Sequence, residues 1–356
     1  MGFRRFSRDG IGPGRAMNSP GIKADAILRP NPAPHKTDSI AMFSVIVPVY
    51  VNEAFVSDLL ARLERLHGRL PGGVEAVIVI DGSSDRSMER LAEALPRMPF
   101  PSQLLLLSRN FGSFSAIQAG LQHARGEHFT VMSADLQEPE ELVVSFHAQL
   151  AADECDVVVG RREGRADRLV SRLLATLFWQ AYRRLVQPEI PTGGIDIFGC
   201  NRVFRDHLLA LRESHSSLVG LMYWLGFRRH EVPYRRLPRE HGRSAWSLRR
   251  RVHYMLDSVF AFSYLPIRLM ELTGVLGLLL GIVLSIVVVY TRLRNGVVVP
   301  GYTATVLTVV FFGALNALGI GVLGEYVWRA FENTKGRPPY VVARSLRFGE
   351  EREAVE

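Results

Sequence analysis

Five short apolar runs mark the first half of the chain, and polar residues follow the end of each run. Runs this apolar and β-branched are typical of strands that are buried on both faces. Leucines at helical spacing, from Leu59 to Leu66, separate the first two runs and complete a strand–helix–strand unit. The pattern predicts an α/β fold, with a mostly parallel sheet and flanking helices. The runs are Phe43–Tyr50, Val74–Ile80, Leu104–Leu107, His128–Met132 and Asp156–Gly160.

The polar clusters share one position relative to the predicted strands. Each follows a strand end, and the carboxyl ends of parallel strands meet at one edge of a sheet. Open α/β sheets bind their ligands in the crevice at that edge, so the clusters predict a crevice of nucleotide size. The clusters are Asp81–Asp85, Ser108–Ser113, Ser133–Glu141 and the pair Arg161 and Arg162.

The stretch Val131–Glu141 places a carboxylate and an amide two residues apart, on Asp135 and Gln137, just after a buried run. Hard oxygen ligands suit Mg²⁺ or Mn²⁺ holding a diphosphate, because such ions take one or two carboxylates together with substrate phosphates. The alternative is a polar exit from the strand in which Asp and Pro serve a turn. The stretch is therefore a candidate metal–diphosphate site.

Two basic segments follow the predicted sheet. Arg168–Gln187 has apolar residues at helical spacing with arginines beside them, which suits a helix at the membrane interface or one packed on the sheet. Arg228–Arg251 is the most basic part of the chain and precedes a further helical stretch and an apolar run. This position favours lipid headgroups or a lipid phosphate as its partner, and a solvated basic face is the alternative.

Two apolar runs near the C-terminus, Leu272–Tyr290 and Thr303–Val327, are long enough to cross about 30 Å of hydrocarbon. Asn316 lies inside the second run, and we expect it to form an interhelical hydrogen bond. Basic residues are more frequent outside this pair than in its connecting loop, so both termini are expected in the cytoplasm. The expected location is the inner (cytoplasmic) membrane, with a multi-pass topology.

The pattern divides the chain into five regions. Residues 1–41 lack the apolar centre of a signal peptide and are expected to form a disordered leader. Residues 42–245 form the cytoplasmic α/β domain, and residues 246–268 form juxtamembrane amphipathic helices at the membrane interface. Residues 269–328 form the two-helix transmembrane hairpin, and residues 329–356 form a cytoplasmic tail.

The composition of the chain limits the kinds of binding partner that we expect. A net charge of +8 suits anionic lipid or an anionic substrate. Nucleic acid is not expected, because the arginines cluster beside the membrane segments and no nucleic-acid-binding module is recognised. Cys155 and Cys200 give neither a disulfide framework nor metal-ligand spacing. Association of the membrane helices into a homo-oligomer is a further expectation.

A set of short motifs occurs in order along residues 43–345, and the set resembles one family. That family is the polyprenyl-phosphate glycosyltransferases, an inverting group with the GT-A (Rossmann-like) fold that includes dolichyl-phosphate mannose synthase and bacterial undecaprenyl-phosphate glucosyltransferases. The motifs are Pro48-Val49-Tyr50 with Asn52-Glu53; Asp81-Gly82-Ser83-Ser84-Asp85; Arg109-Asn110-Phe111-Gly112; Ala134-Asp135-Leu136-Gln137-Glu138-Pro139; Arg239 with Gly242 and Ser244; and Gly324-Glu325-Tyr326 with Lys335-Gly336-Arg337-Pro338.

The resemblance implies transfer of a sugar from a nucleotide-sugar donor to a polyprenyl phosphate acceptor, with Mg²⁺ or Mn²⁺ held by Asp135 and Gln137. It assigns catalytic roles to Asp135, to Arg161 or Arg162 at a phosphate, and to Arg239 with Ser244 as a closing segment. The residues that it assigns to the nucleotide-sugar pocket are Pro48, Tyr50, Glu53, Asp81, Asp85, Arg109, Asn110, Ser133 and Ala134.

Four positions depart from the family pattern. Ile80 and Ser133 stand where carboxylates are usual, and Ser113 and Ala245 stand where lysines are common. These departures keep open a second function, a membrane-anchored protein that binds nucleotide-sugar without catalysis. A processive polysaccharide synthase is a third reading, but Gln180–Arg184 lacks the tryptophan of that group's motif.

Overall fold

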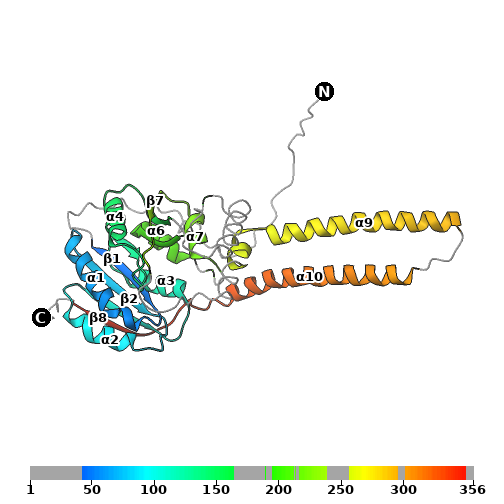
Figure 1. The fold of residues 1–356 in the computed structure, drawn as a ribbon. Coiled ribbons are helices and arrows are strands. Elements are labelled where there is room, and N and C mark those ends of the chain that lie inside the picture. The colour runs from blue at the N-terminus through cyan, green and yellow to red at the C-terminus, as the bar shows by residue number, and fades with distance from the viewer. Residues whose placement is uncertain are drawn as a thin grey trace, which may run out of the picture. The chain divides into compact units, whose positions relative to one another are not determined.

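The computed structural model describes residues 42–163, 189, 195–211, 213, 216–238, 256–295 and 301–349. Within these residues, eight strands form one sheet in the order β7-β5-β6-β4-β1-β2-β3-β8 (Figure 1). All five strands predicted from the sequence are present, with ends shifted by at most two residues. The strands are β1 (Phe43–Val49), β2 (Val74–Ile80), β3 (Ser102–Leu107), β4 (His128–Val131), β5 (Val157–Arg162), β6 (Ile195–Asn201), β7 (Arg229–Tyr234) and β8 (Val342–Phe348).

Most strands of this sheet run in one direction. β1 is parallel to β2 and β4, and β2 is parallel to β3. β6 lies antiparallel between β4 and β5, so β5 runs in the same direction as β4, and β7 is parallel to β5. The prediction of an α/β fold with a mostly parallel sheet is confirmed. The carboxyl ends of β1 to β5 therefore lie at the same edge of the sheet. Those of the two antiparallel strands, β6 and β8, lie at the opposite edge.

Helices cover both faces of the sheet and complete two hydrophobic cores. In β1, Val45 and Val47 face the first core whereas Ile46 faces the second, as the alternation of side chains along a strand requires. Burial on both faces explains why this strand is apolar apart from Ser44. The first core is completed by α1 (Val56–Arg69), α2 (Ser87–Ala94) and α4 (Glu140–Ala151), and the second by α3 (Ser113–His123), α6 (Arg202–Ala210) and α7 (Leu218–Trp224); two short 3-10 helices are η2 (Glu53–Phe55) and η3 (Leu95–Arg97).

The edge strand β8 comes from the C-terminal end of the chain, where the sequence pattern predicts only a tail. It pairs antiparallel with β3, from Ser102 opposite Phe348 to Leu107 opposite Val342. Phe348 also packs against the first core. Residues 342–348 are therefore part of the sheet, although more than 230 residues separate them from β3 in the sequence.

Two long helices, α9 (Leu265–Asn295) and α10 (Tyr302–Thr334), precede β8 (Figure 1). Each contains a segment long and apolar enough to cross a membrane, Leu265–Val287 and Thr308–Thr334. Among the side chains that the structure describes in these two helices, the apolar ones are mostly exposed, as expected for helices that contact lipid. The predicted pair of long apolar helices is confirmed, and both helices extend beyond the predicted ends.

Several predicted segments lie outside the described residues. They include the leader 1–41, the amphipathic segment Arg168–Gln187, and the part of the basic segment that contains Arg239 and Ser244. The juxtamembrane region is described from residue 256 onward, where residues 256–262 are helical.

A buried charged cluster joins the amino-terminal ends of the central strands, opposite the polar loops. Glu75, the second residue of β2, is 0% exposed. Its carboxylate accepts hydrogen bonds from Ser44 Oγ at 2.6 Å, Gln103 Nε2 at 2.8 Å and Arg125 Nε at 2.8 Å. Because buried charges are costly unless they are paired and hydrogen-bonded, this cluster requires all of its partners.

Replacing Glu75 with glutamine should lower the free energy of unfolding by about 2 kcal/mol, because the amide nitrogen cannot accept the hydrogen bonds that the buried carboxylate oxygen accepts. Burial alone would raise the pKa of the Glu75 carboxyl, but its hydrogen bonds with Ser44, Arg125 and Gln103 hold that pKa below the ordinary value. A carboxyl whose pKa is lower in the folded state contributes stability above its unfolded pKa, about 4.3, and loses it as the pH falls through the folded pKa. The difference in Tm between the wild type and Glu75→Gln should therefore shrink below about pH 4.

Thermal melting in detergent between neutral and acidic pH measures this effect. Glu154→Gln, at an exposed position, is the matched control and should melt like the wild type at every pH. A Tm difference that stays constant down to the most acidic pH would contradict the assigned role of the Glu75 charge.

Candidate functional site

Hydrogen bonds tie the loop after β1 to the loop after β2 at the carboxyl edge of the sheet. Val51 N donates to Ser83 Oγ at 2.8 Å, and Glu53 N donates to Asp85 Oδ2 at 2.9 Å. Ser83 Oγ in turn donates to Asp85 Oδ1 at 2.5 Å. Glu53 and Asp85, which the family resemblance assigns to one pocket, therefore lie in loops that are in direct contact.

The carboxylates of Asp85 and Glu53 both organise these loops. Burial tends to raise the pKa of Asp85, but hydrogen bonds from Ser83, Ser87 and the Glu53 amide hold it below the ordinary value. Asp85 is therefore ionised at neutral pH. Glu53 pairs with Arg90 at 3.0 Å and accepts a hydrogen bond from the Arg86 amide at 3.2 Å. Their contact with a nucleotide stays a prediction.

Asp81 holds the loop after β3 against the loop after β2. Its side chain is only 3% exposed, and its two carboxylate oxygens accept hydrogen bonds from the amides of Phe111 at 2.7 Å and Gly112 at 2.9 Å. The adjacent Gly82 has φ +56°, and a Cβ there would lie 2.3 Å from the Arg109 carbonyl carbon. Only glycine allows this approach. In this structure Asp81 holds the backbone of the loop after β3, and its predicted place in the nucleotide-sugar pocket stays untested.

The remaining predicted pocket residues lie along the same edge with different exposures. Tyr50 is 37% exposed, and Arg109 is exposed with its guanidinium carbon 4.0 Å from the centre of the Phe111 ring. Asn110 Nδ2 donates to the Asp81 carbonyl at 3.3 Å. Pro48 is half-buried in β1, and Ala134 is buried. Of these, Tyr50 and Arg109 present the most accessible side chains for a ligand.

The candidate metal loop, residues 133–138, has a constrained backbone between its two predicted ligands. Leu136 has φ +57°, a left-handed conformation that is unfavourable for leucine, and its side chain packs against the first core. Asp135 and Gln137 are the residues directly before and after Leu136. Ser133 Oγ lies 2.8 Å from Asp135 Oδ1 and also contacts Glu138 Oε2, so one hydroxyl joins two carboxylates.

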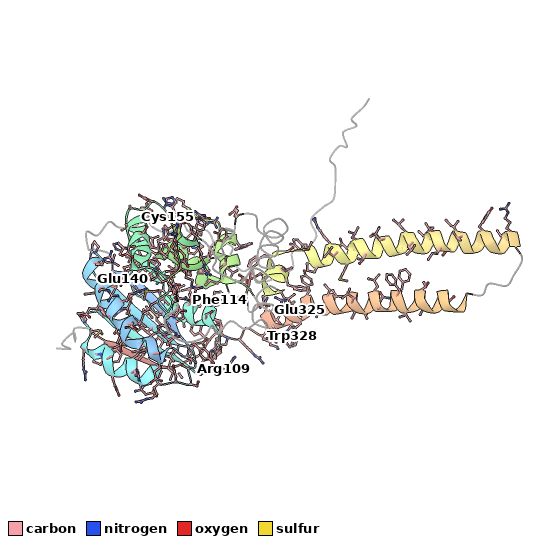
Figure 2. All side chains as sticks on the ribbon, viewed as in Figure 1. Arg109, Phe114, Glu140, Cys155, Glu325 and Trp328 are labelled. Atoms are coloured by element: carbon pink, nitrogen blue, oxygen red, sulfur yellow. The ribbon has the colours of Figure 1, made fainter. Side chains whose placement is uncertain are left out.

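Arg62, on α1, holds this loop from the side of the first core. Its Nη1 donates to the carbonyls of Leu136 at 3.2 Å and Glu138 at 2.6 Å. Its Nε lies 3.5 Å from Glu140, at the start of α4 (Figure 2). The Arg62 side chain is 12% exposed. Neither Arg62 nor Glu138 is among the predicted site residues, because Arg62 lies on a helix that has no catalytic motif of its own.

A second contact joins the metal loop to the segment that leads toward Arg239. Leu237 N donates to the Gln137 carbonyl at 2.8 Å, and Gln137 Nε2 donates to the Leu237 carbonyl at 3.2 Å. The second bond turns the amide so that its side-chain oxygen is the atom able to bind a cation. Leu237 precedes Arg239 by two residues, and Arg239 and Ser244 themselves lie outside the described residues.

Arg161 and Arg162 end β5, at the same edge of the sheet as the metal loop. Arg161 lies 3.7 Å from Glu163 and 3.5 Å from Glu231, and its side chain is 41% exposed. Arg162 is half-buried. The structure thus places both arginines at the predicted edge, whereas their contact with a phosphate stays a prediction.

The donor set of the metal loop fits a hard divalent cation. Asp135 would supply one carboxylate and Gln137 one amide oxygen, and water and diphosphate oxygens would complete the ligands of the ion. Across the part of the chain that the structure describes, no group of three or more His, Cys, Asp and Glu residues could hold a metal ion by itself. Such a site would therefore depend on substrate phosphates, as is usual for Mg²⁺.

Three of the four departures from the family pattern lie in the described residues. Ile80 is 0% exposed in the first core, so this position faces the interior rather than the pocket. Ser113 is the exposed first residue of α3. Ser133 retains an oxygen at the metal loop and joins Asp135 to Glu138. Ala245 lies outside the described residues.

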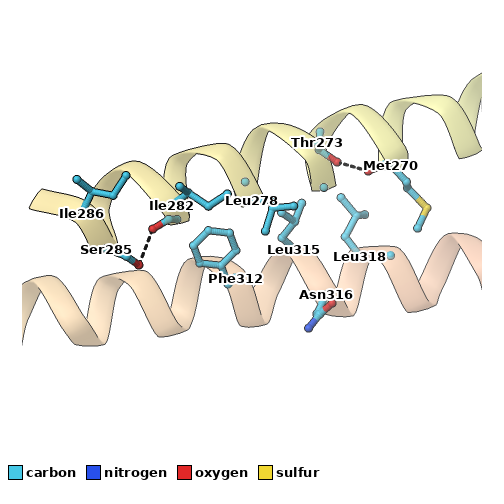
Figure 3. A pocket seen from close by; sticks show the side chains of 14 residues that line it. Met270, Thr273, Leu278, Ile282, Ser285, Ile286, Phe312, Leu315, Asn316 and Leu318 are labelled. Carbon is cyan, nitrogen blue, oxygen red and sulfur yellow. Dashed lines mark hydrogen bonds between the residues drawn. The ribbon is translucent and has the colours of Figure 1, made fainter. Parts of the chain in front are cut away.

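A cavity of about 730 Å³ lies between α9 and α10 (Figure 3). Small residues line its α9 side, including Gly274, Gly277 and Gly281, and Phe312 lines its α10 side. Asn316 also borders it. In the described part of the chain no hydrogen bond joins Asn316 to α9, so the predicted interhelical bond is not formed within this hairpin, and its side chain points away from α9 (Figure 3).

Known proteins resemble the chain over most of its length. Residues 44–211 match the family model of glycosyl transferase family 2. The glycosyltransferase CsbB of Bacillus subtilis is 33% identical over 305 residues, which cover 85% of this chain and 91% of that protein. The undecaprenyl-phosphate 4-deoxy-4-formamido-L-arabinose transferase of Pseudomonas paraeruginosa is 33% identical over 312 residues, which cover 86% of this chain and 91% of that protein. The crystal structure of the mannosyltransferase PcManGT from Pyrobaculum calidifontis, in complex with GDP-Man and Mn²⁺, has a TM-score of 0.44 at 18% identity and covers 81% of this chain and 88% of that chain.

An α/β sheet with polar loops at its carboxyl edge, joined to two long apolar helices, defines a membrane glycosyltransferase with a GT-A-like fold. The chain belongs to glycosyl transferase family 2. The resemblance inferred from the ordered motifs is confirmed.

Proposed function

We propose that this enzyme transfers one sugar from a nucleotide-sugar to polyprenyl phosphate at the cytoplasmic face of the inner membrane, with inversion at the anomeric carbon. The observation that carries the proposal is the metal loop at the crevice edge, in a chain that also has two membrane-length apolar helices. The name of the Pseudomonas paraeruginosa relative, an undecaprenyl-phosphate sugar transferase, supports the choice of acceptor. The product would serve synthesis or modification of cell-envelope glycans.

The proposed orientation follows from charge. Arg329, Lys335, Arg337 and Arg344 follow the second apolar run, and the positive-inside rule then favours cytoplasmic termini and a cytoplasmic catalytic domain. The five-region division of the chain stays part of this proposal, with residues 342–348 added to the catalytic domain. Association into a homo-oligomer stays a prediction.

In the proposed donor complex, the loops after β1, β2 and β3 receive the nucleoside, and the metal loop receives the diphosphate. Tyr50 and Arg109 are the exposed side chains available for contact. Asp135 and Gln137 would hold Mg²⁺ or Mn²⁺, which when bound would neutralise the charge that develops on the departing diphosphate. Arg161, Arg162 and Arg239 supply positive charge for the same phosphates or for the acceptor.

The chemistry needs no strong general base. A phosphate monoester has a second pKa near 6, so the acceptor oxygen is already anionic at neutral pH. This oxygen forms a bond to the anomeric carbon while the bond from that carbon to the diphosphate oxygen breaks, and the electron pair leaves with the nucleoside diphosphate. The protein has to align these atoms within about 3–3.5 Å and exclude competing water.

Mass spectrometry of the lipid fraction tests the proposal. The detergent-purified full chain is incubated with undecaprenyl phosphate, Mg²⁺ or Mn²⁺, and a panel of nucleotide-sugars. A mass increase of one sugar that needs both metal and lipid phosphate is the expected result. Donor binding without turnover across the panel, beside an active relative, would instead support a nucleotide-sugar-binding protein. A product that keeps the donor's anomeric configuration would exclude direct displacement.

A further inference from the structure

The helical residues 256–262 meet the end of α10 in a polar contact centred on Arg329. Arg329 Nη2 lies 2.9 Å from Asp257 Oδ1, and Arg329 Nε donates to Glu325 Oε1 at 2.8 Å. The Arg329 side chain is only 12% exposed, compared with 30% for Asp257 and 41% for Glu325. A guanidinium buried between two carboxylates balances their charge and also fixes the relative orientation of the two helices that carry them, because its donors have a rigid, planar arrangement.

Aromatic side chains complete this contact. The Arg329 guanidinium carbon lies 5.1 Å from the centre of the Phe260 ring, within the range of a cation–π interaction. Phe260 also packs edge-on against Tyr326, with 5.2 Å between ring centres. The Tyr326 hydroxyl donates to the Ser263 carbonyl at 3.2 Å. We call these residues the Arg329 joint: Asp257, Phe260, Ser263, Glu325, Tyr326 and Arg329.

The same short helix is also attached to the catalytic domain. Phe262 packs on Gly220 of α7 so closely that a Cβ on Gly220 would lie 2.2 Å from its ring. Phe262 also contacts the second core, which includes Leu221 of α7 and Phe204 of α6. Residues 256–262 therefore contact α10 through one set of side chains and the catalytic domain through another.

The chain beyond α10 makes a second attachment to the same domain. The Tyr340 hydroxyl donates to Gln122 Oε1 of α3, and Ser108 N donates to the Val341 carbonyl at 2.9 Å. The strand β8 then continues the attachment along β3. The end of α10 is thus tied to the catalytic domain both through the Arg329 joint and through the residues that follow.

The joint lies where α10 would leave the hydrocarbon. The uncharged part of α10, from Thr303 to Gly324, spans about 30 Å at 1.5 Å per residue. Glu325 and Arg329, the first charged residues of α10, follow it where the helix would reach the membrane surface. Trp328, labelled near Glu325 in Figure 2, is 51% exposed. Phe331 is 53% exposed, and such exposed aromatic side chains are typical of the aromatic belts of membrane proteins. The headgroup level, where an acceptor phosphate lies, therefore coincides with the level of the joint.

We propose that Arg329 is a positioning residue that sets the height and orientation of the catalytic crevice above the bilayer, so that a membrane-embedded phosphate reaches the donor sugar. This inference rests on the proposed function. The membrane holds the acceptor phosphate at a fixed depth, and the sheet holds the donor. Among the described residues, the Arg329 joint and the β8 attachment relate the two. Arg329 acts through residues 256–262 and α7, and it does not contact either substrate.

A comparison of two acceptors tests the role of Arg329. The full-length wild type and Arg329→Gln are assayed in liposomes with undecaprenyl phosphate, and also with geranyl phosphate, a short acceptor that reaches the crevice from water. For Arg329→Gln, kcat/KM with the bilayer acceptor should fall on the order of tenfold, because small displacements of reacting groups are costly. With geranyl phosphate it should change by about twofold or less, and KM for the donor should be unchanged.

Three further variants make the comparison specific. Arg329→Lys keeps the charge and should recover part of the lost rate. Asp257→Asn combined with Arg329→Gln should be no worse than the larger single effect, since the two residues act through one contact. Lys335→Gln is the matched control, because it removes a positive charge from the same end of α10 where Lys335 contacts Glu332 rather than Asp257. It should leave the ratio of the two acceptors at the wild-type value.

Equal losses with both acceptors would overturn the proposal, because they would indicate damage to the crevice itself. Wild-type kcat/KM with both acceptors in Arg329→Gln would overturn it as well. A wild type that is active on geranyl phosphate keeps the proposed function intact in either case. A wild type that glycosylates neither acceptor, with any donor, would instead refute the proposed function.

Discussion

Replacing Asp135 with alanine should reduce kcat on the order of a thousandfold, because the metal loop loses the carboxylate that would hold the cation at the diphosphate. Gln137→Ala should keep measurable turnover but require several-fold more Mg²⁺ or Mn²⁺, since an amide oxygen is the weaker ligand. Steady-state transfer to polyprenyl phosphate, measured as a function of metal concentration, separates the two effects.

Glu141→Ala is the matched control for Asp135→Ala. Glu141 lies six residues further along, its side chain is 74% exposed, and it contacts Arg69 at 3.5 Å. Its removal should leave both the rate and the metal response close to those of the wild type. Near-normal rates in Asp135→Ala and in Gln137→Ala would refute the assignment of the metal loop.

Arg62→Ala should have the second largest effect, a loss of kcat on the order of a hundredfold. The two carbonyls that Arg62 binds, of Leu136 and Glu138, lose their donor, and the left-handed backbone at Leu136 loses a support. The loop should then present Asp135 less accurately, so the variant should also need more metal for half-maximal rate. Hydrogen exchange of residues 133–138 in the metal-free protein gives an independent measurement and should be faster than in the wild type.

Arg65→Ala distinguishes loop support from general loss of charge on α1. Arg65 contacts Glu140 from the same helix, but its side chain is 55% exposed and does not bind the loop carbonyls. We expect wild-type activity and wild-type exchange in residues 133–138. If Arg62→Ala matched Arg65→Ala in both measurements, Arg62 would have no part in holding the loop.

The parts of the fold that were predictable are those set by local pattern. β1 and β2 are mostly apolar on both faces because both faces are covered, so a nearly continuous apolar sequence identifies them. β7 escaped prediction because it is an edge strand with mostly half-buried or exposed residues and contains Pro233. An edge position tolerates proline and polar side chains, which removes the usual signal. β8 was not predicted for a related reason, because its arginines resemble those of a solvated tail.

Some residues of the candidate site could also be predicted from the sequence, and others could not. Asp135, Gln137 and the Asp81–Asp85 cluster follow predictable strands, so their place at one edge could be inferred from sequence. Arg62 could not, because 74 residues separate it from Leu136 and only the packing of α1 beside α4 brings them together. The use of Asp81 for backbone amides was equally inaccessible, since it depends on how closely Gly82 approaches Arg109.

The pairing of β8 with β3 makes the membrane hairpin an internal insertion rather than an appendage. The ribosome completes β1 to β7 before α9 and α10 emerge, yet the sheet gains its last strand only after both helices have been made. Until then β3 has an unpaired edge of the kind that promotes association between chains. Closure of the sheet therefore has to wait until both helices have been synthesised. A soluble catalytic fragment would have to keep residues 340–349, rejoined by a short linker, rather than end before α9.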